Sequence, residues 1–226
     1  MTRAIGLNFH GIGAPNRALE PGEAPYWLSP DQFERVLDQV AAAADPSVFV
    51  LTFDDGNLSD HDIALPALAA RGLQARFFVL TGRIGQPGSL DSHRIQALQQ
   101  AGMKIGSHGI GHVMWPTLDN VALAQELRSS RARLEDICGC AVTEAGIPFG
   151  RYDARVLRAL RAAGYTAAWS SDGGRLHLDA FLRPRTSLRG DMSDAMIGSV
   201  LAGQMPPLRR LRRALGMVRR RWTMTG

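Results

Sequence analysis

Short apolar runs alternate along the chain with stretches that have the spacing of amphipathic helices. We expect buried strands at residues 4–9, 47–53, 75–80, 103–107, 143–147, 165–169 and about 182–187, because short apolar runs bounded by turn residues are typical of strands covered on both faces. Helical patterns fall between them, at about 60–71, 91–101, 119–137 and 153–163. Strands that alternate with helices indicate parallel pairing through right-handed crossovers.

A further helix should begin after the first strand. Ser29 is a favourable N-cap and Pro30 suits a first helical turn, and apolar residues then follow at helical spacing at Phe33, Val36, Leu37 and Val40. With this helix the element order predicts an α/β fold, either a β/α barrel or an open doubly wound sheet. In both architectures ligands bind at the carboxyl ends of the strands, where the βα loops converge.

The 226 residues suffice for one domain of this kind, and the charge divides the chain into two parts. Seven arginines and no acidic residue lie in residues 209–221, although the whole chain carries only +5. Residues 1–208 therefore hold 19 cationic against 21 acidic side chains, a net charge of −2. A mildly acidic domain argues against a nucleic-acid partner, which usually requires a basic face.

We divide the chain into a domain at 1–205 and a C-terminal tail at 206–226. Apolar residues in the tail recur every three or four positions, with arginines between them, at Leu208, Leu211, Leu215, Val218 and Trp222. This pattern predicts a basic amphipathic helix that makes peripheral membrane contact through residues 206–222. Two alternatives are docking on the acidic surface of the domain and a disordered tail, and Gly216 weakens each helical interpretation.

Two cysteines are too few for a disulfide framework, so we expect Cys138 and Cys140 to be reduced thiols near a helix end. The N-terminus lacks the long apolar segment of a signal peptide, and no run of 18 apolar residues occurs. We therefore expect a cytoplasmic protein, located at the inner membrane if the tail binds lipid.

Metal-ligand and acid–base residues follow three of the predicted strands. His10 follows the first, Asp54 and Asp55 the second, and His108 and His112 the fourth. Two imidazoles and one carboxylate are a ligand set of catalytic zinc sites, and either Asp54 or Asp55 could complete it. The other carboxylate would stay ionised beside the ion and accept a proton. Without a metal, the two carboxylates would be a turn and the histidine pair a coincidence of spacing.

A series of motifs carries a resemblance to a known family. The segments TFDDG (52–56), RFFVLTG (76–82), IGSHGIGH (105–112), IPFGRYD (147–153) and RAAGYTAAW (161–169) occur in this order. Over about residues 4–190 the chain resembles the polysaccharide deacetylase family, also called the NodB homology domain or carbohydrate esterase family 4. The segment IGLNFHGIG (5–13) is similar to the branch with a histidine at the end of its first strand. The resemblance implies a distorted (β/α)7 barrel.

The resemblance also implies roles for individual residues. Asp54 would be the general base, and Asp55, His108 and His112 would hold one divalent ion, usually zinc, with cobalt, nickel, iron or manganese in some members. A backbone N–H near Phe149, in the turn that ends at Gly150, would bind the oxyanion. Trp115 could stack on a sugar ring at the rim, although core packing is the default interpretation of a tryptophan.

The chain departs from the family pattern at two positions. The familiar acid, a histidine in a late Leu-x-His segment, is absent, and the last histidine, His177, lies in a predicted loop. We favour His10 as the general acid over His177, with a purely structural His10 as the alternative. Gly146 stands where the family has an arginine that orients the base, and Arg183 or Arg185 could replace it.

These features predict a metal-dependent hydrolase that removes an N-acetyl group from a sugar of an oligo- or polysaccharide, of which a lipid-linked precursor is one form. The alternatives are an O-acetyl carbohydrate esterase, a cyclic amide hydrolase and a catalytically inactive sugar-binding homologue. The last is favoured by the missing arginine and late histidine. The sequence predicts neither the sugar nor the oligomeric state.

Overall fold

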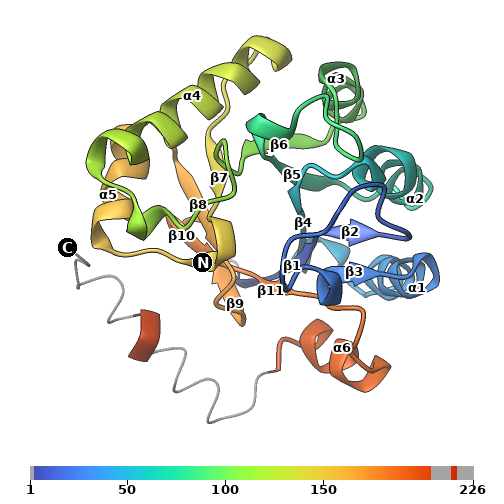
Figure 1. The fold of residues 1–226 in the computed structure, drawn as a ribbon. Helices are drawn as coiled ribbons and strands as arrows, with labels where there is room; N and C mark the ends of the chain where they lie inside the picture. The colour runs from blue at the N-terminus through green and yellow to red at the C-terminus, as the bar shows by residue number, and fades with distance from the viewer. Residues whose placement is uncertain (1–2, 205–214, 218–226) are drawn as a thin grey trace.

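The computed structural model describes residues 3–204 and 215–217. A parallel sheet curls into a barrel, with helices around its outside (Figure 1). The strand order is β10-β8-β7-β6-β5-β4-β1-β11, and every neighbouring pair in it is parallel. The first six of these strands along the chain are β1 (Arg3–Phe9), β4 (Phe49–Asp55), β5 (Ala75–Val79), β6 (Lys104–Ser107), β7 (Glu144–Gly146) and β8 (Ala167–Ser170).

One segment of chain closes the barrel. Its first half, β10 (Leu182–Pro184), pairs with β8, and its second half, β11 (Thr186–Ser187), pairs with β1 at the other edge of the sheet. Only Arg185 separates the two halves. Counted once, this segment is the seventh strand, so the predicted (β/α)7 barrel is confirmed.

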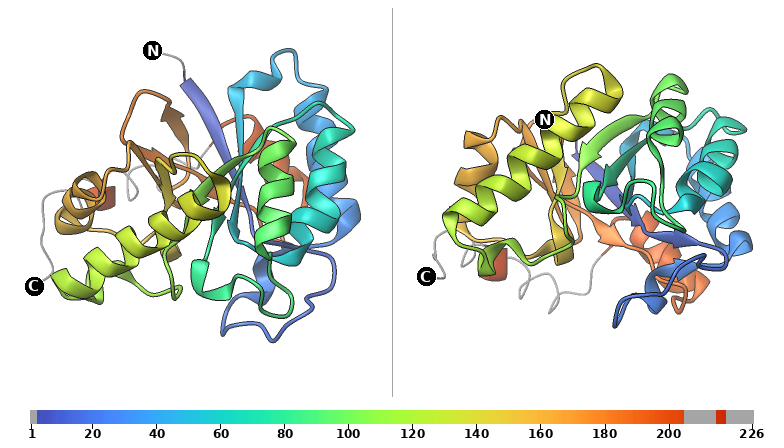
Figure 2. Two further views of the ribbon diagram at one scale, coloured as in Figure 1. Left: turned by 90° about the horizontal axis from the view of Figure 1, so that it is seen from above. Right: turned by 45° about the horizontal axis from the view of Figure 1, so that its top comes forward.

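Three short strands were not predicted. Strand β9 (Arg175–His177) pairs antiparallel with β1, with His177 opposite Arg3. Strands β2 (Gly11–Ile12) and β3 (Trp27–Leu28) pair with each other in the loop that follows β1. Figure 2 shows β1 running from the amino-terminal end of the barrel to this loop at the carboxyl end.

The helices lie between the strands as predicted: α1 (Pro30–Ala41), α2 (Leu65–Ala69), α3 (Ser92–Gln100), α4 (Asn120–Cys138) and α5 (Ala154–Ala162). The Ser29 side chain caps α1 by accepting the N–H of Gln32 at 3.2 Å. The helix expected at 60–71 is a π-helical turn, Asp60–Ala64, followed by α2, because Pro66 has no N–H to continue an α-helical ladder. An additional helix, α6 (Asp194–Leu201), was not predicted.

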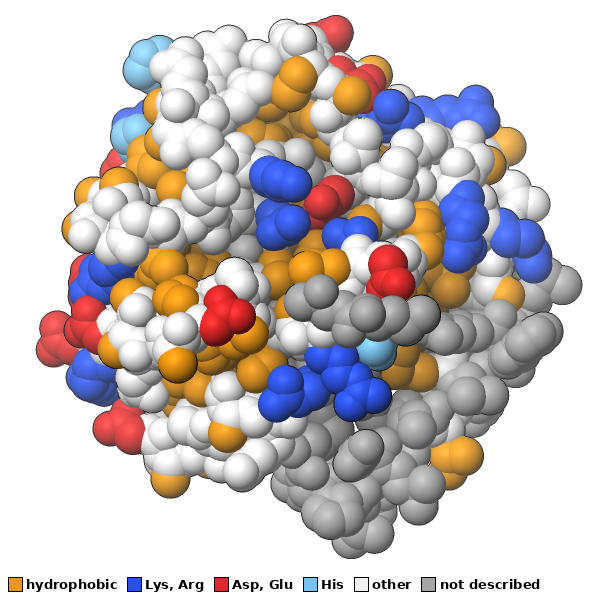
Figure 3. Space-filling model, turned by 180° about the vertical axis from the view of Figure 1, so that it is seen from behind, with side chains coloured by type: hydrophobic (Ala, Val, Ile, Leu, Met, Phe, Trp, Pro, Cys, Tyr) orange, Lys and Arg blue, Asp and Glu red, His pale blue; other side chains and the backbone are white. Residues whose placement is uncertain are grey.

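The side chains alternate between the barrel interior and the helix layer. On β4, Val50 packs inside with Phe78 and Trp169, whereas Leu51 and Phe53 belong to the large cluster beneath α1, α2 and α3. A second cluster underlies α4 and α5. In the same interior cluster, Trp169 donates to Glu144 at 2.8 Å, and the guanidinium groups of Arg76 and Arg183 lie over its ring. Figure 3 shows the molecule from the amino-terminal end of the barrel.

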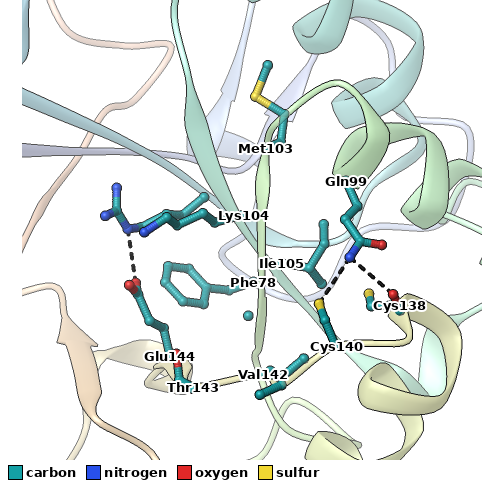
Figure 4. A pocket seen from close by; sticks show the side chains of 13 residues that line it. Phe78, Gln99, Met103, Lys104, Ile105, Cys138, Cys140, Val142, Thr143 and Glu144 are labelled. Atoms are coloured by element: carbon teal, nitrogen blue, oxygen red, sulfur yellow. Dashed lines mark hydrogen bonds and ion pairs between the residues drawn. The ribbon is translucent and has the colours of Figure 1, made fainter.

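A pocket beside this amino-terminal end contains both cysteines (Figure 4). They are free thiols, as predicted, with Cys138 at the last residue of α4. The Gln99 side-chain amide donates to the carbonyl of Cys138 at 3.1 Å and to Sγ of Cys140 at 3.0 Å. No residue of the predicted metal site lines this pocket.

The tail prediction, residues 206–222, falls almost entirely outside the described residues. Residues 215–217 are helical, and Met217 packs against the cluster under α4 and α5. Within the described residues, no helix combines the length and apolar character needed to cross a membrane.

Candidate active site

A pocket of about 350 Å³ opens at the carboxyl ends of the strands. It brings together six of the residues predicted from the sequence, which are His10, Asp54, Asp55, His108, His112 and Phe149. The sequence did not indicate Glu20, Glu23 and Tyr26, which also line it. These six predicted residues therefore line one pocket.

The two adjacent carboxylates diverge because the backbone leaves the extended conformation at Asp55, the last residue of β4. Asp54 continues the inward-facing series of β4, which places its carboxylate inside the barrel. Asp55 has a φ of 78°, outside the range of strands, and its carboxylate lies beside the imidazoles of the loop after β6. The backbone thus gives each carboxylate a different environment.

The Asp55 carboxylate lies between the two histidines. Its Oδ1 is 3.6 Å from Nε2 of His108 and 3.6 Å from Nε2 of His112. One ligand atom from each of these residues lies within 4.8 Å of the others. Oδ1 of Asp55 is buried and has no hydrogen-bond partner among the described residues. A buried carboxylate oxygen without a partner is costly, and a divalent cation would remove that cost.

Hydrogen bonds on the far side of each imidazole fix which nitrogen faces Asp55. Nδ1 of His108 donates to the carbonyl oxygen of Gly146 at 2.9 Å, and Nδ1 of His112 donates to Oε2 of Glu20 at 2.7 Å. Because these oxygens only accept, each Nδ1 carries the proton and each Nε2 presents a lone pair. The three residues therefore fit a divalent ion in both atom type and tautomer. Burial lowers the pKa of His108 to about 4, which keeps this imidazole neutral.

The chain between the histidines is a turn held by one carboxylate. The Glu126 carboxylate, from α4, accepts the N–H groups of Ile110 at 2.7 Å and Gly111 at 3.2 Å. Gly109 has a φ of 87°, and a Cβ there would lie 2.5 Å from Oε2 of Glu126. Only glycine therefore allows the carboxylate to approach and hold both histidines on one side of the turn.

The Asp54 carboxylate is bound by Arg185 and Asn8. Arg185 donates to both of its oxygens, at 2.7 and 2.9 Å, and the Asn8 side chain donates to Oδ2 at 2.9 Å. Burial alone would raise the pKa of Asp54, but the Arg185 guanidinium outweighs it and holds that pKa far below its usual range. Asp54 is consequently ionised whenever the protein is folded near neutral pH.

Arg185, and not Arg183, thus makes the contact with Asp54 that was expected of a replacement arginine. Arg183 lies over Trp169 and donates to the carbonyl of Ala180. Position 146 requires glycine for a steric reason, because a Cβ there would be 2.9 Å from Cγ of Phe78 and 3.0 Å from Nδ1 of His108. This site has no room for a side chain at position 146.

His10 lies in the pocket, as predicted, with its ring centroid 4.9 Å from that of Tyr26. Its Nδ1 is buried and has no hydrogen-bond partner among the described residues. The alternative acid, His177, is ruled out because it pairs with Arg3 at the amino end of β1, the opposite end of the barrel. The seven residues of β1 separate the two ends by about 20 Å.

The Phe149 turn borders the metal-ligand cluster. Phe149 has a φ of 56°, and its ring stacks on that of His112 with centroids 4.2 Å apart. The N–H of Gly150 donates to the carbonyl of Ile147 at 2.9 Å, and Gly150 does not line the pocket. Of this turn, Gly150 therefore does not supply the predicted oxyanion donor, because its N–H is already bonded to Ile147.

For Trp115, the suggested stacking on a sugar ring is wrong. Its side chain is fully buried and packs with Leu123 and Leu127 beneath α4, where no sugar can reach it. The default interpretation, core packing, holds for this tryptophan.

Several residues of the site were missed. Asn8 could have been found, because it is a polar residue inside an otherwise apolar strand. Glu20 and Glu126 lie in segments whose patterns predict only a loop and a helix, and neither pattern indicates a contact with the histidine turn. Their roles follow from the way distant loops meet at the end of the barrel.

Comparisons with known proteins identify the family of this chain. The sequence profile of the polysaccharide deacetylase family matches residues 41–168. YxkH of Bacillus subtilis is 25% identical over 176 residues, which is 77% of this chain and 63% of that protein. A chitin deacetylase of Pestalotiopsis sp is 30% identical over 128 residues, 56% of this chain and 42% of that enzyme. The chain thus spans less than two thirds of the length of either relative.

The fold has similar solved structures. The deacetylase PplD of Streptococcus pyogenes, solved in complex with acetate, superposes with a TM-score of 0.75 at 19% identity, covering 90% of this chain and 99% of that one. The likeness shows a shared barrel. Since the family profile matches more than half of the residues, this chain belongs to the polysaccharide deacetylase family.

Proposed function

We propose that the protein is a metal-dependent carbohydrate deacetylase that hydrolyses the N-acetyl group of a sugar in an oligo- or polysaccharide. The observation that carries this proposal is the buried, unpartnered Oδ1 of Asp55 between the Nε2 atoms of His108 and His112, with the ionised Asp54 adjacent in sequence. The chitin deacetylase among the relatives supports an acetylated carbohydrate as substrate.

Asp55, His108 and His112 would hold the ion, most simply zinc given one carboxylate and two imidazoles. Cobalt, nickel, iron and manganese are the alternatives. A bound divalent ion supplies Lewis acidity, which polarises the acetyl carbonyl and increases the acidity of water.

The side chains around the ligands supply the proton transfers. Asp54 is ionised and held by Arg185 and Asn8, so it accepts the proton of the attacking water without changing orientation. His10 faces the same pocket and donates a proton to the departing amine, which is a poor leaving group when unprotonated. Phe149 lines the pocket, and its backbone N–H would stabilise the negative oxygen of the tetrahedral intermediate.

An O-acetyl esterase is the second candidate, because an alkoxide leaves more readily than an amine and depends less on His10. The hypothesis of a catalytically inactive homologue rested on the missing arginine and the missing late histidine. The first of these no longer supports it, since Arg185 supplies the contact expected of the missing arginine.

Acetate release from N-acetylated and O-acetylated oligosaccharides, with zinc content measured in parallel, tests the proposal. We expect about one zinc per wild-type chain, loss of zinc in Asp55→Ala, and loss of acetate release in Asp54→Asn with zinc retained. A wild type that takes up no zinc would refute the metal centre. Zinc binding without acetate release from any substrate would favour the sugar-binding homologue, and release only from O-acetyl sugars the esterase.

Peripheral membrane contact through residues 206–222 and a cytoplasmic location stay predictions. Sedimentation with anionic liposomes should show stronger binding by the full chain than by a chain that ends at residue 205. Equal binding would remove the membrane role of the tail.

A further inference from the structure

Glu20 joins three loops at the edge of the metal site. Its Oε2 accepts the Nδ1–H of His112 at 2.7 Å, and its Oε1 forms an ion pair with Arg83. Glu20 comes from the loop between β2 and β3, Arg83 from the turn after β5, and His112 from the turn after β6. One oxygen of this partly exposed carboxylate therefore holds the imidazole, and the other is held by Arg83.

The loop that carries Glu20 is itself held in place. The N–H of Glu20 donates to Oε2 of Glu23 at 2.8 Å, and the N–H of Glu23 donates to the carbonyl of Glu20 at 3.0 Å. Glu23 forms an ion pair with Arg17, whose guanidinium donates to Oδ1 of Asn57 at 2.9 Å. Asn57 lies two residues after Asp55, so these contacts connect the histidine side of the site to the carboxylate side.

The two histidines differ in their Nδ1 partners. His108 donates to a neutral backbone carbonyl, whereas His112 donates to a carboxylate. A carboxylate fixes the ring and also increases the electron density on the opposite nitrogen, which makes Nε2 a stronger ligand. His112 needs this support more, because its backbone has a φ of 48° and its side chain is less buried than that of His108.

We propose that Glu20 is a positioning residue of the metal centre, which holds the Nδ1–H of His112, directs Nε2 toward the ion and strengthens it as a ligand. This inference rests on the metal centre of the proposed function. Nothing in the sequence around Glu20 indicates the role, because the contact exists only when the loop after β1 folds over the histidine turn.

The test is zinc affinity of the full-length protein without substrate, measured by competition with a chromophoric chelator. Glu20→Ala removes the acceptor, and we expect zinc binding to weaken by about 10- to 100-fold, the usual loss when such a partner is removed. Glu20→Gln keeps an acceptor oxygen but no charge, so its affinity should lie between wild type and Glu20→Ala. The visible absorption of the cobalt-loaded protein should shift in both variants, since the ligand field at His112 changes.

Glu34→Ala is the matched control, because Glu34 also forms an ion pair with an arginine, Arg71, and has a similarly exposed side chain, 42% against 38%. Its zinc affinity should equal that of wild type. Wild-type affinity and an unchanged cobalt spectrum in both Glu20 variants would overturn the inference while leaving the metal centre intact. If Glu20→Ala does not fold, the zinc affinity of the near-isosteric Glu20→Gln decides the inference. Absence of zinc uptake by the wild type would instead overturn the metal centre itself.

Discussion

The guanidinium of Arg185 contacts both oxygens of Asp54 at 2.7 and 2.9 Å, at the point where the last strand closes the barrel. Arg185 separates β10 from β11, and its side chain is fully buried. Gly6 on β1 makes room for it, since a Cβ there would lie 3.1 Å from Cγ of Arg185. The residue that joins the two halves of the closing strand therefore also orients the proposed base.

Arg185→Met should destabilise the fold strongly. The substitution leaves a buried carboxylate without its cation, which typically costs about 3–5 kcal/mol. Asp54→Asn in the same chain removes the unpaired charge, so the double variant should recover part of the loss. Urea denaturation of the two single variants and the double variant measures the coupling. A cost below about 1 kcal/mol for Arg185→Met, or strictly additive effects, would show that the pair is not coupled.

Gly146→Ala should damage the metal site through His108. The added methyl would lie 2.9 Å from Cγ of Phe78 and 3.0 Å from Nδ1 of His108, so the imidazole must move from its carbonyl partner. We expect weaker zinc binding and a loss of about 1–3 kcal/mol in stability, typical of overpacking. Gly198→Ala is the control, because a Cβ at this position in α6 meets nothing within 4 Å. Equal melting temperatures and zinc affinities in the two variants would contradict the steric argument.

His108 should make the metal-free protein sensitive to acid. Burial lowers its pKa from 6.5 to about 4, so between these pH values the unfolded chain binds a proton that the folded chain does not. This contribution to stability is complete above pH 6.5 and is lost as the pH falls toward 4, on the order of 3 kcal/mol. Denaturation curves across this range should show the decrease, and His108→Gln should reduce it. If His108→Gln loses as much stability in acid as wild type, the loss belongs to other groups. His61→Gln, at a more exposed position, is the control and should behave as wild type.

Asp60 should destabilise the protein at higher pH. Its side chain is fully buried, both carboxylate oxygens lack a hydrogen-bond partner among the described residues, and burial with the nearby charges of Asp55 and Asp54 raises its pKa well above the ordinary value. Stability is therefore lost as pH rises toward the folded-state pKa. Asp60→Asn should raise the melting temperature at pH 8 more than at pH 5. Asp62→Asn, at an exposed position, is the control and should leave the melting temperature unchanged at both pH values. A lower melting temperature for Asp60→Asn than for wild type at pH 8 would contradict the prediction.

Much of the fold could be predicted from local pattern. The Ser29 cap and the stripe from Phe33 to Val40 predicted α1, and the apolar runs predicted the seven parallel strands, because periodicity and capping act within a few residues. Asp54, Asp55, His108 and His112 were found for the same reason, since each follows a strand whose carboxyl end must face the site.

Contacts between segments far apart in sequence could not be predicted and were seen only in the tertiary structure. It selected Arg185 over Arg183, excluded His177, buried Trp115 and placed Glu20 against His112. These outcomes depend on strand register and loop packing, where one residue reverses the direction of a side chain and no local pattern records the choice. The sequence alone therefore determined which residues reach the end of the barrel, and the folded chain decided which of them touch.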